Sequence, residues 1–184
     1  GICGQMHTHV YLDGEGRPLR PAITWLDQRS CGLVRDINCD SEAQSLVFRE
    51  SQNFATTTYL APQAAWVKRE QGPLWSGVRR ILVAKDYLKY RLTGRMVTDV
   101  SDASGTLLFN VKERCWSGEL FRFFGIAPGL LPEVLPSDEI IGKITSEAAR
   151  ATGLTEGTPV ANGSSDNSAS ALGAGMVVPG QVTL

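Results

Sequence analysis

The stretch 158–173 constrains the fold of this chain most. The apolar residues Val160 and Ala161 precede a run of small polar residues, and an Ala/Ser/Leu segment follows. This order is typical of a strand, a tight turn and a helix. Asp166 is the only charged residue between Glu156 and the end of the chain, and its neighbours are too small to cover it. We therefore expect the turn to present the Asp166 carboxylate to a cleft.

Three interpretations of this turn are open. Ser165 or Asp166 could cap the helix by accepting a backbone N–H. A nucleophile elbow on Ser165 would require a glycine at Asn167 and is disfavoured. Alternatively, Asp166 is a general base that faces a sugar hydroxyl. A carboxylate near a helix N-terminus is a weak base, which suits phosphoryl transfer because the hydroxyl need lose little proton in a loose transition state. Capping and catalysis are compatible at one carboxylate.

Composition narrows the class of protein. With 184 residues, 42% of them hydrophobic and 20% charged, the chain can form a core and is one domain or part of a larger one. The 18 basic and 19 acidic residues are interspersed, so we expect no nucleic-acid or membrane partner. No apolar run approaches the ~20 residues of a membrane span, and no leader pattern is present. We expect a cytoplasmic protein whose partners are small molecules or like subunits, as in a homodimer.

Cysteines and histidines indicate no metal site. The four cysteines lack a C-x-x-C pair, which is typical of reduced thiols in a cytosolic protein: Cys3, Cys31, Cys39 and Cys115. His7 and His9 would share one face of a strand, but no third ligand lies nearby. We expect these histidines to form hydrogen bonds, and we predict no metal-binding residues.

Short extended and helical segments alternate along the chain. A hairpin is expected from 8–12 and 21–25 around a turn at 13–16, with a further strand at 140–144. Helical patterns with glycine or proline at their ends predict helices that begin at Pro62 or lie at 86–92, 119–124 and 147–152. The alternation predicts an α/β class with a mixed sheet.

The helix at 86–92 is expected to be amphipathic. Its apolar residues, among them Leu88, should face a core, whereas the basic Lys89 and Arg91 should face solvent. The small polar stretch 98–106 is interpreted as a loop that feeds a strand.

The segment after Trp25 has two interpretations. Trp25 could be a core residue followed by a surface ion pair of Asp27 and Arg29. It could instead form the aromatic wall of a carbohydrate site, with the charged residues as hydroxyl partners. This segment alone does not separate the two.

Five motifs, in this order and spacing, resemble the FGGY carbohydrate kinases, and among them most closely the xylulokinases. They are Gly4-Gln5-Met6-His7; Ile23-Thr24-Trp25 with Asp27 and Arg29; Lys85-Asp86-Tyr87-Leu88 with Arg91-Leu92-Thr93-Gly94; Thr98 to Thr106; and Gly163 to Asn167. The resemblance covers essentially all 184 residues.

The resemblance implies a fold and a domain organisation. It implies a ribonuclease-H-like (actin-like ATPase) α/β lobe with a mixed sheet and inserted helices, which is incomplete here. Residues 1–175 would be part of the N-terminal, sugar-binding lobe, and 176–184 would start the connection to a C-terminal lobe that this chain lacks. The chain has no initial methionine, and 180–184 resembles the middle of a strand, so we expect a piece of a longer protein.

The resemblance also implies site residues. Asp166 matches the aspartate that accepts the proton of the sugar hydroxyl. Met6 and His7 match the dipeptide that contacts the ketose, where glycerol kinases have Arg-Glu. Gln5, Trp25 and Asn167 are further candidates for the pocket wall. Leu26 and the pair Ser164-Ser165 depart from the family pattern, which often has an amide and glycines there.

The implied function is ATP-dependent phosphorylation of a ketopentose by the full-length protein, with D-xylulose converted to D-xylulose 5-phosphate and Mg²⁺ bound to the phosphates. The Asp-x-Gly-Thr phosphate loop and the second lobe are not in this chain, and no G-x-x-x-x-G-K-[ST] loop replaces them. The fragment is therefore expected to bind neither ATP nor Mg²⁺ and to be inactive, and the cofactor-binding residues are unknown. The alternatives are another FGGY sugar or polyol kinase, acting on ribulose, glycerol or gluconate, and a non-catalytic sugar-binding or actin-like module.

Overall fold

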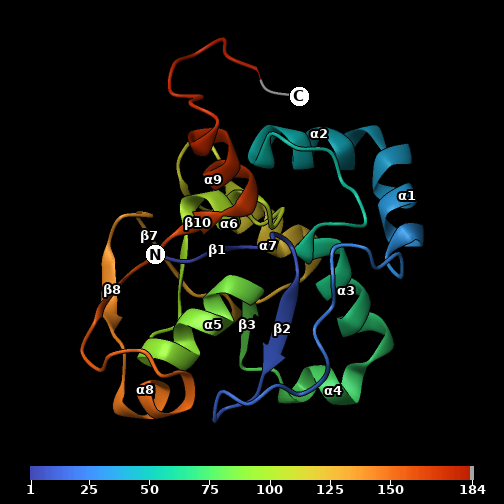
Figure 1. The fold of residues 1–184 in the computed structure, drawn as a ribbon. Coiled ribbons are helices and arrows are strands. Elements are labelled where there is room, and N and C mark those ends of the chain that lie inside the picture. The colour runs from blue at the N-terminus through green and yellow to red at the C-terminus, as the bar shows by residue number, and fades with distance from the viewer. Residues whose placement is uncertain (183–184) are drawn as a thin grey trace.

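The structure is a computed structural model that describes residues 1–182. Its strands form small two-stranded sheets between helices (Figure 1). The parallel pairs are β1 (Cys3–Gly4) with β10 (Ser164–Ser165) and β4 (Val97–Asp99) with β7 (Glu133–Leu135). The antiparallel pairs are β2 (His9–Leu12) with β3 (Arg80–Val83), β5 (Phe109–Asn110) with β6 (Cys115–Trp116), and β8 (Ile140–Lys143) with β9 (Pro159–Ala161). Both kinds of pairing thus occur in residues 1–182, as expected of an α/β lobe, but in separate two-stranded sheets and not within one mixed sheet.

The helices occur between and after these strands. They are α1 (Cys31–Cys39), α2 (Ser41–Ser51), α3 (Leu60–Glu70), α4 (Gly72–Gly77), α5 (Ala84–Thr93), α6 (Val100–Ser104), α7 (Gly118–Phe124), α8 (Ser146–Thr152) and α9 (Asp166–Gly173), with a 3₁₀ turn at Pro128–Leu130. Each helix predicted from the sequence is present to within two residues at its start. Gly94, Gly125 and Gly153 end α5, α7 and α8 in the left-handed conformation, which glycine adopts without steric cost.

Two apolar clusters lie on either side of β2 and β3. The larger one includes Tyr11 and Ile81 and packs against α1, α3 and α4, which lie on one side of β2 in Figure 1. On the opposite face of the same strands, Val10 and Leu82 form a smaller cluster with residues of α5. Alternate side chains of a strand point to opposite faces, so β2 is buried on both sides.

The predicted hairpin is present only in part. The turn at Asp13 forms, with the Asp13 carboxylate accepting from the backbone N–H groups of Glu15 and Arg17, each at 2.9 Å. However, β2 pairs along its length with β3, and Ile23 makes only an isolated bridge to His9. The segment between the turn and Ile23 contains two prolines, which lack the N–H that a ladder needs, whereas β3 supplies a continuous apolar run.

Two further predictions were wrong. In α5, Lys89 is buried with 0% exposure and Leu88 is 48% exposed, so these two residues face the opposite way from the prediction, whereas Leu92 is buried and Arg91 is exposed as expected. The stretch 98–106 is not a loop, because β4 ends at Asp99 and α6 follows directly. Both errors have one cause: these segments meet in a buried cluster of charged side chains, which hydrophobic patterning cannot reveal.

The end of the chain differs from its prediction. Residues 181–182 form no strand, and 183–184, which complete the predicted strand, lie outside the described residues. Among the helices of residues 1–182, none has the length and apolar character needed to cross a membrane. The four cysteines are free and exposed.

Candidate functional site

The parallel pairing of β1 with β10 brings the first residues of the chain next to the segment that precedes α9. Cys3 lies opposite Ser164 and Gly4 opposite Ser165. Both strands run in the same direction, so the residues that follow them emerge at one edge. The segment 5–7 follows β1, and Asp166 follows β10. The carboxyl ends of parallel strands are where ligands bind in open α/β sheets.

At this edge the structure has a cavity of about 420 Å³. It is lined by Gln5, Met6, His7, Trp25, Thr58, Asp166 and Asn167. All six residues that the sequence suggested for the site therefore lie around one cavity, together with Thr58, which sequence reasoning missed. Thr58 lies in a run of three threonines without a motif, so no sequence pattern distinguishes it. The volume is within the range of small-molecule sites.

His7 is fixed in an uncommon backbone conformation, with φ of +67°. Its Nδ1–H donates to the carbonyl oxygen of Gly105 at 2.8 Å, and its ring meets the edge of Tyr59 with 5.0 Å between centroids. Burial lowers the pKa of His7, although the hydrogen bond to Gly105 and the charge of Asp166 oppose the shift. A neutral His7 with its proton on Nδ1 presents Nε2 as a hydrogen-bond acceptor.

Gly105 is required at this position for space. A Cβ there would lie 2.8 Å from Met6 Cε and 3.0 Å from His7 Cε1. Its φ of −82° is accessible to any residue, so the constraint is the close approach of the two cavity side chains and not the backbone.

A second chain of hydrogen bonds, formed by His9 and Tyr11, holds the backbone of His7. The His9 Nδ1–H donates to the carbonyl oxygen of His7 at 2.8 Å, and the Tyr11 hydroxyl donates to His9 Nε2 at 2.9 Å. Burial lowers the pKa of His9 to about 4, so its ring is neutral at pH 7. His7 and His9 thus form hydrogen bonds, as predicted, and belong to one chain that leads from the core to the cavity.

Asp166 is the first residue of α9, and its side chain is half-buried. The helix cap is Ser165, whose Oγ accepts from the Ser168 N–H at 3.3 Å. Asp166 Oδ1 accepts from the Asn167 N–H at 2.9 Å, and the positive end of the helix dipole favours its negative charge. Ser165 therefore performs the capping, which leaves the Asp166 carboxylate facing the cavity.

The turn before Asp166 depends on Gly163. Its φ is +79°, and a Cβ there would lie 1.8 Å from the carbonyl oxygen of Ile2. Only glycine allows β1 and this turn to approach so closely.

In the segment 25–29, Trp25 lines the cavity, whereas Asp27 and Arg29 stabilise the loop. Trp25 is 42% exposed and lines the cavity. Arg29 instead forms a two-point ion pair with Asp27, with both N–O distances at 2.7 Å, and its guanidinium lies 5.0 Å from the centre of the Trp66 ring. Asp27 and Arg29 thus hold the loop and do not line the cavity.

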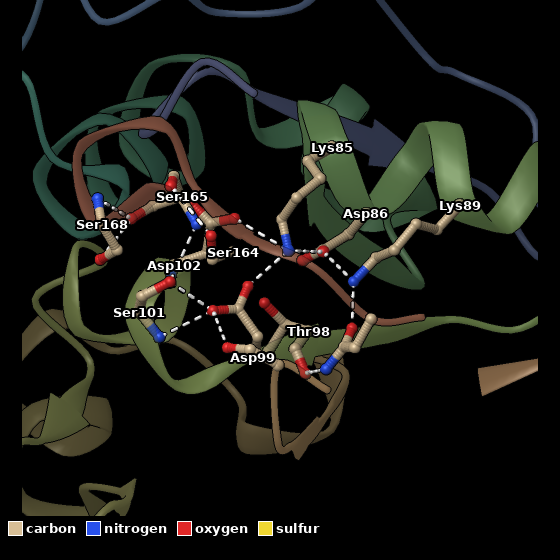
Figure 2. A network of polar contacts seen from close by, with 12 residues as sticks. Lys85, Asp86, Lys89, Thr98, Asp99, Ser101, Asp102, Ser164, Ser165 and Ser168 are labelled. Atoms are coloured by element: carbon tan, nitrogen blue, oxygen red, sulfur yellow. Dashed lines mark hydrogen bonds and ion pairs between the residues drawn. The ribbon is translucent and has the colours of Figure 1, made fainter. Parts of the chain in front are cut away.

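A buried ionic cluster lies next to the turn of Asp166 (Figure 2). The cluster comprises Lys85, Asp86, Lys89, Asp99 and Asp102, none more than 3% exposed. Lys85 Nζ lies 3.2 Å from Asp86 Oδ1 and 3.1 Å from Asp102 Oδ2, and it also contacts Asp99. Lys89 Nζ lies 2.8 Å from Asp86 Oδ1. Lys89 lies one helical turn from both Lys85 and Asp86, a spacing that indicates proximity but not burial.

The cluster shifts the pKa values of its members in different directions. Burial raises the pKa of Asp102 to about 7, although Lys85 opposes the shift. Burial acts to lower the pKa of Lys85, but the three carboxylates outweigh it, and the pKa is raised. Lys85 therefore remains charged and balances carboxylates that would otherwise be isolated in the core.

The three carboxylates are the group in residues 1–182 with the geometry to hold a metal ion, since their ligand atoms lie within 4.8 Å of one another. The ammonium group of Lys85 contacts each of them. The chain thus supplies its own cation at the centre of this group.

Comparison with solved structures defines the class of protein. A xylulose kinase from Rhodospirillum rubrum has a TM-score of 0.90 at 29% identity, over 98% of this chain and 38% of that one. A gluconate kinase from Lactobacillus acidophilus has a TM-score of 0.83 at 26% identity, over 89% of this chain and 33% of that one. The fold is that of one lobe of the actin-like sugar kinases, which confirms the fold class expected from the resemblance.

Sequence comparison gives the family. Residues 1–173 match the FGGY family of carbohydrate kinases, N-terminal domain, and the chain belongs to this family. A xylulose kinase from Staphylococcus xylosus is 35% identical over 175 residues, which are 95% of this chain. The chain spans 36% of the length of that relative.

Proposed function

We propose that the protein to which this chain contributes transfers the γ-phosphoryl group of ATP to a hydroxyl of a ketopentose, D-xylulose, and forms D-xylulose 5-phosphate. One observation carries the proposal: the Asp166 carboxylate and the Met6-His7 pair line the same cavity. In the proposed organisation, residues 1–175 are part of the N-terminal, sugar-binding lobe. The similarity to xylulose kinases supports this choice of substrate.

Each of the six cavity residues that the sequence suggested has a role in this reaction. Asp166 orients the attacking hydroxyl and accepts its proton. His7 accepts a hydrogen bond from another sugar hydroxyl at Nε2, since its Nδ1–H is used by Gly105. Trp25 packs against the carbon face of the sugar, and Gln5 and Asn167 offer amides to the remaining hydroxyls. Met6 closes the apolar side.

ATP and Mg²⁺ are proposed to bind mainly to parts of the full-length protein that this chain does not include. The cavity lining contains no lysine or arginine to hold phosphates. The buried carboxylates near it already have Lys85 as their cationic partner. The residues present therefore fit a sugar, and the γ-phosphoryl group would reach Asp166 from the open side of the cavity.

The same lining argues against gluconate, which the related Lactobacillus acidophilus enzyme is named for. The carboxylate of gluconate would require a cationic partner, and Asp166 would repel it. A neutral polyol or ketose meets no such penalty. Ribulose and glycerol remain the competing neutral substrates.

Kinetics of the full-length protein test the proposal. We expect Asp166→Asn to lower kcat by about 10²- to 10⁴-fold, the usual contribution of a general base. D-xylulose should be preferred over ribulose, glycerol and gluconate in a substrate panel. Turnover by Asp166→Asn within tenfold of the parent would exclude the base assignment, and a preference for glycerol or gluconate would exclude the ketopentose. A non-catalytic module would phosphorylate none of the four.

A further inference from the structure

A continuous polar path connects the buried cluster to the residue before Asp166. The backbone N–H of Ser165 donates to Ser101 Oγ at 2.9 Å. Ser101 Oγ in turn donates to Asp99 Oδ1, and Asp99 Oδ2 contacts Lys85 Nζ. Figure 2 shows these groups in sequence between α5 and the turn. The last atom of the path is thus one peptide unit from Asp166.

The direction of each hydrogen bond in this path is fixed. An ionised carboxylate can only accept, so the single proton of the Ser101 hydroxyl is committed to Asp99. A lone pair of Ser101 Oγ is then left to accept the Ser165 N–H. Burial acts to raise the pKa of Asp99, but the charge and hydrogen bond of Lys85 lower it overall, so Asp99 is ionised at neutral pH.

The other end of the turn has its own anchor. Lys89 Nζ donates to Asn162 Oδ1. The Asn162 amide donates from Nδ2 to the carbonyl oxygens of Thr98 at 2.9 Å, Leu135 at 3.1 Å and Pro136 at 3.1 Å. The turn between Asn162 and Ser165 is therefore held at both ends. Lys89 of the cluster holds the Asn162 end, and Ser101, which is bonded to Asp99 of the cluster, holds the Ser165 end. Only the Ser165 end is adjacent to Asp166.

We propose that Ser101 is a positioning residue for Asp166: its hydroxyl, oriented by Asp99, fixes the Ser165 N–H and so sets where the Asp166 carboxylate stands relative to the sugar. This inference rests on the proposed function, in which Asp166 is the general base. Ser165 caps α9 through its own Oγ, so the Ser101 contact is not needed to form the helix. Its effect should therefore fall on the alignment of Asp166 and not on folding.

Alignment of this kind affects the chemical step more than sugar binding. A displacement of about 1 Å at a catalytic group can lower the rate by about 10²-fold. Gln5, Met6, His7 and Trp25 belong to other segments, and the Gly105 carbonyl oxygen that holds His7 is not part of the path through Ser101, so we expect these four residues to stay in place. Sugar affinity should therefore change little.

The test compares two serine variants of the full-length protein. Ser101→Ala removes the hydroxyl of the path, whereas Ser104→Ala, on the same helix α6, removes a hydroxyl that donates only to the Ser101 carbonyl oxygen at 2.7 Å. Both side chains are half-buried. For Ser101→Ala we expect kcat to fall about 10- to 100-fold, with KM for D-xylulose within about threefold of the parent. Ser104→Ala should remain within about twofold, and Ser101→Thr, which retains the hydroxyl, should recover most of the rate.

A double variant separates positioning from a general structural role. If Ser101 acts through Asp166, Ser101→Ala should lower single-turnover rates by less than about threefold in the Asp166→Asn background. Thermal unfolding of each variant monitors the fold. Should Ser101→Ala not be recovered folded, Ser101→Cys preserves the volume with a poor acceptor and is expected to show the same loss of kcat.

The outcomes are distinct. Equal kinetics of Ser101→Ala and Ser104→Ala would overturn the inference while leaving the base assignment intact. If Ser101→Ala lowered the rate by the same factor in the Asp166→Asn background as in the parent, the inference would be overturned too, because Ser101 would then act on a group other than Asp166. Normal turnover by Asp166→Asn would remove the base assignment, and this inference with it, whereas the choice of D-xylulose as substrate is tested separately by the substrate panel.

Discussion

His7 Nδ1 lies 2.8 Å from the carbonyl oxygen of Gly105, although 98 positions separate the two residues. The contact links the segment after β1 with the end of α6, the helix that also carries Ser101. Both the histidine and the aspartate of the cavity are thus held by α6, one through Gly105 and one through Ser101. This short helix sets the two polar sides of the site relative to each other.

The first prediction follows from the lack of space for a side chain at Gly105. In Gly105→Ala the new methyl group would lie 2.8 Å from Met6 and 3.0 Å from His7, so both side chains must move. We expect KM for D-xylulose in the full-length protein to rise about tenfold, equivalent to ~1.4 kcal/mol of binding. Steady-state kinetics measure it. The control is Gly14→Ala, where no atom lies within 4 Å of the added methyl group, and an equal effect of both variants would contradict the prediction.

The buried His9 leads to a prediction on pH and stability. Its folded pKa of about 4 lies below its ordinary value of 6.5, so the unfolded chain binds more protons between these values. Stability from this group is complete above pH 6.5 and is lost as the pH falls through 6.5 toward 4. At 1.36 kcal/mol per pH unit, the total is about 3 kcal/mol.

Urea unfolding of this chain between pH 7 and pH 4 measures the effect of His9. Asp102, whose pKa is raised to about 7, has the opposite dependence, because the folded chain then binds more protons. The parent and His9→Gln share Asp102 and the other titrating groups, so the difference between their pH-dependent stabilities reports His9 alone. We expect the parent to lose more stability than His9→Gln over this range, and parallel curves would show that His9 does not titrate as described.

The buried cluster leads to a prediction of unequal effects. Lys85→Met would leave Asp86, Asp99 and Asp102 buried without their common cation, and we expect a loss of about 3–5 kcal/mol. Asp102→Asn should cost less than about 1 kcal/mol, because a carboxyl with a pKa of about 7 is half-protonated at neutral pH.

The matched control for Lys85→Met is Arg17→Met, which breaks an exposed pair with Asp13 whose arginine is 72% exposed. An exposed pair contributes about 0–1 kcal/mol. Chemical unfolding of all three variants ranks them. If Lys85→Met were no more destabilising than Arg17→Met, Lys85 would not balance the buried carboxylates as described.

The success of the sequence in finding the cavity has a physical reason. Asp166 follows a short strand and a turn of small residues that leaves it uncovered, so local chemistry singled it out, whereas Met6 and His7 were identified only through the resemblance to a family. The pairing of β1 with β10, which brings these residues together, joins residues more than 150 positions apart, and no pattern in the sequence predicted it.

The buried charges could not be found in the same way. Lys89 has the pattern of a solvent-facing residue, and only its partners Asp86 and Asn162 make its burial tolerable. Those partners are assembled by tertiary structure, so patterning assigned Lys89 to the wrong face. Thr58 was missed for a related reason: a threonine in a polar loop differs from its neighbours only by the cavity that it faces.

The final prediction concerns the isolated chain of 184 residues, which spans 36% of a related xylulose kinase. We expect it to bind D-xylulose with a Kd of about 1 mM or weaker, which corresponds to roughly −4 kcal/mol. The reason is enclosure: Trp25 is 42% exposed and Asn167 is also exposed, so one face of the sugar stays in water. Small ligands that bind tightly usually have ~70–90% of their surface buried.

Kinase activity of this isolated chain should be undetectable, because phosphoryl transfer depends on groups that position and neutralise the phosphates, and the cavity lining includes none that is cationic. Calorimetry with D-xylulose and, separately, with ATP and Mg²⁺ measures both expectations, with Asp166→Asn as the control for sugar bound in the cavity. Micromolar affinity for ATP would contradict this assignment, since it would require a nucleotide site within the residues that line or surround this cavity.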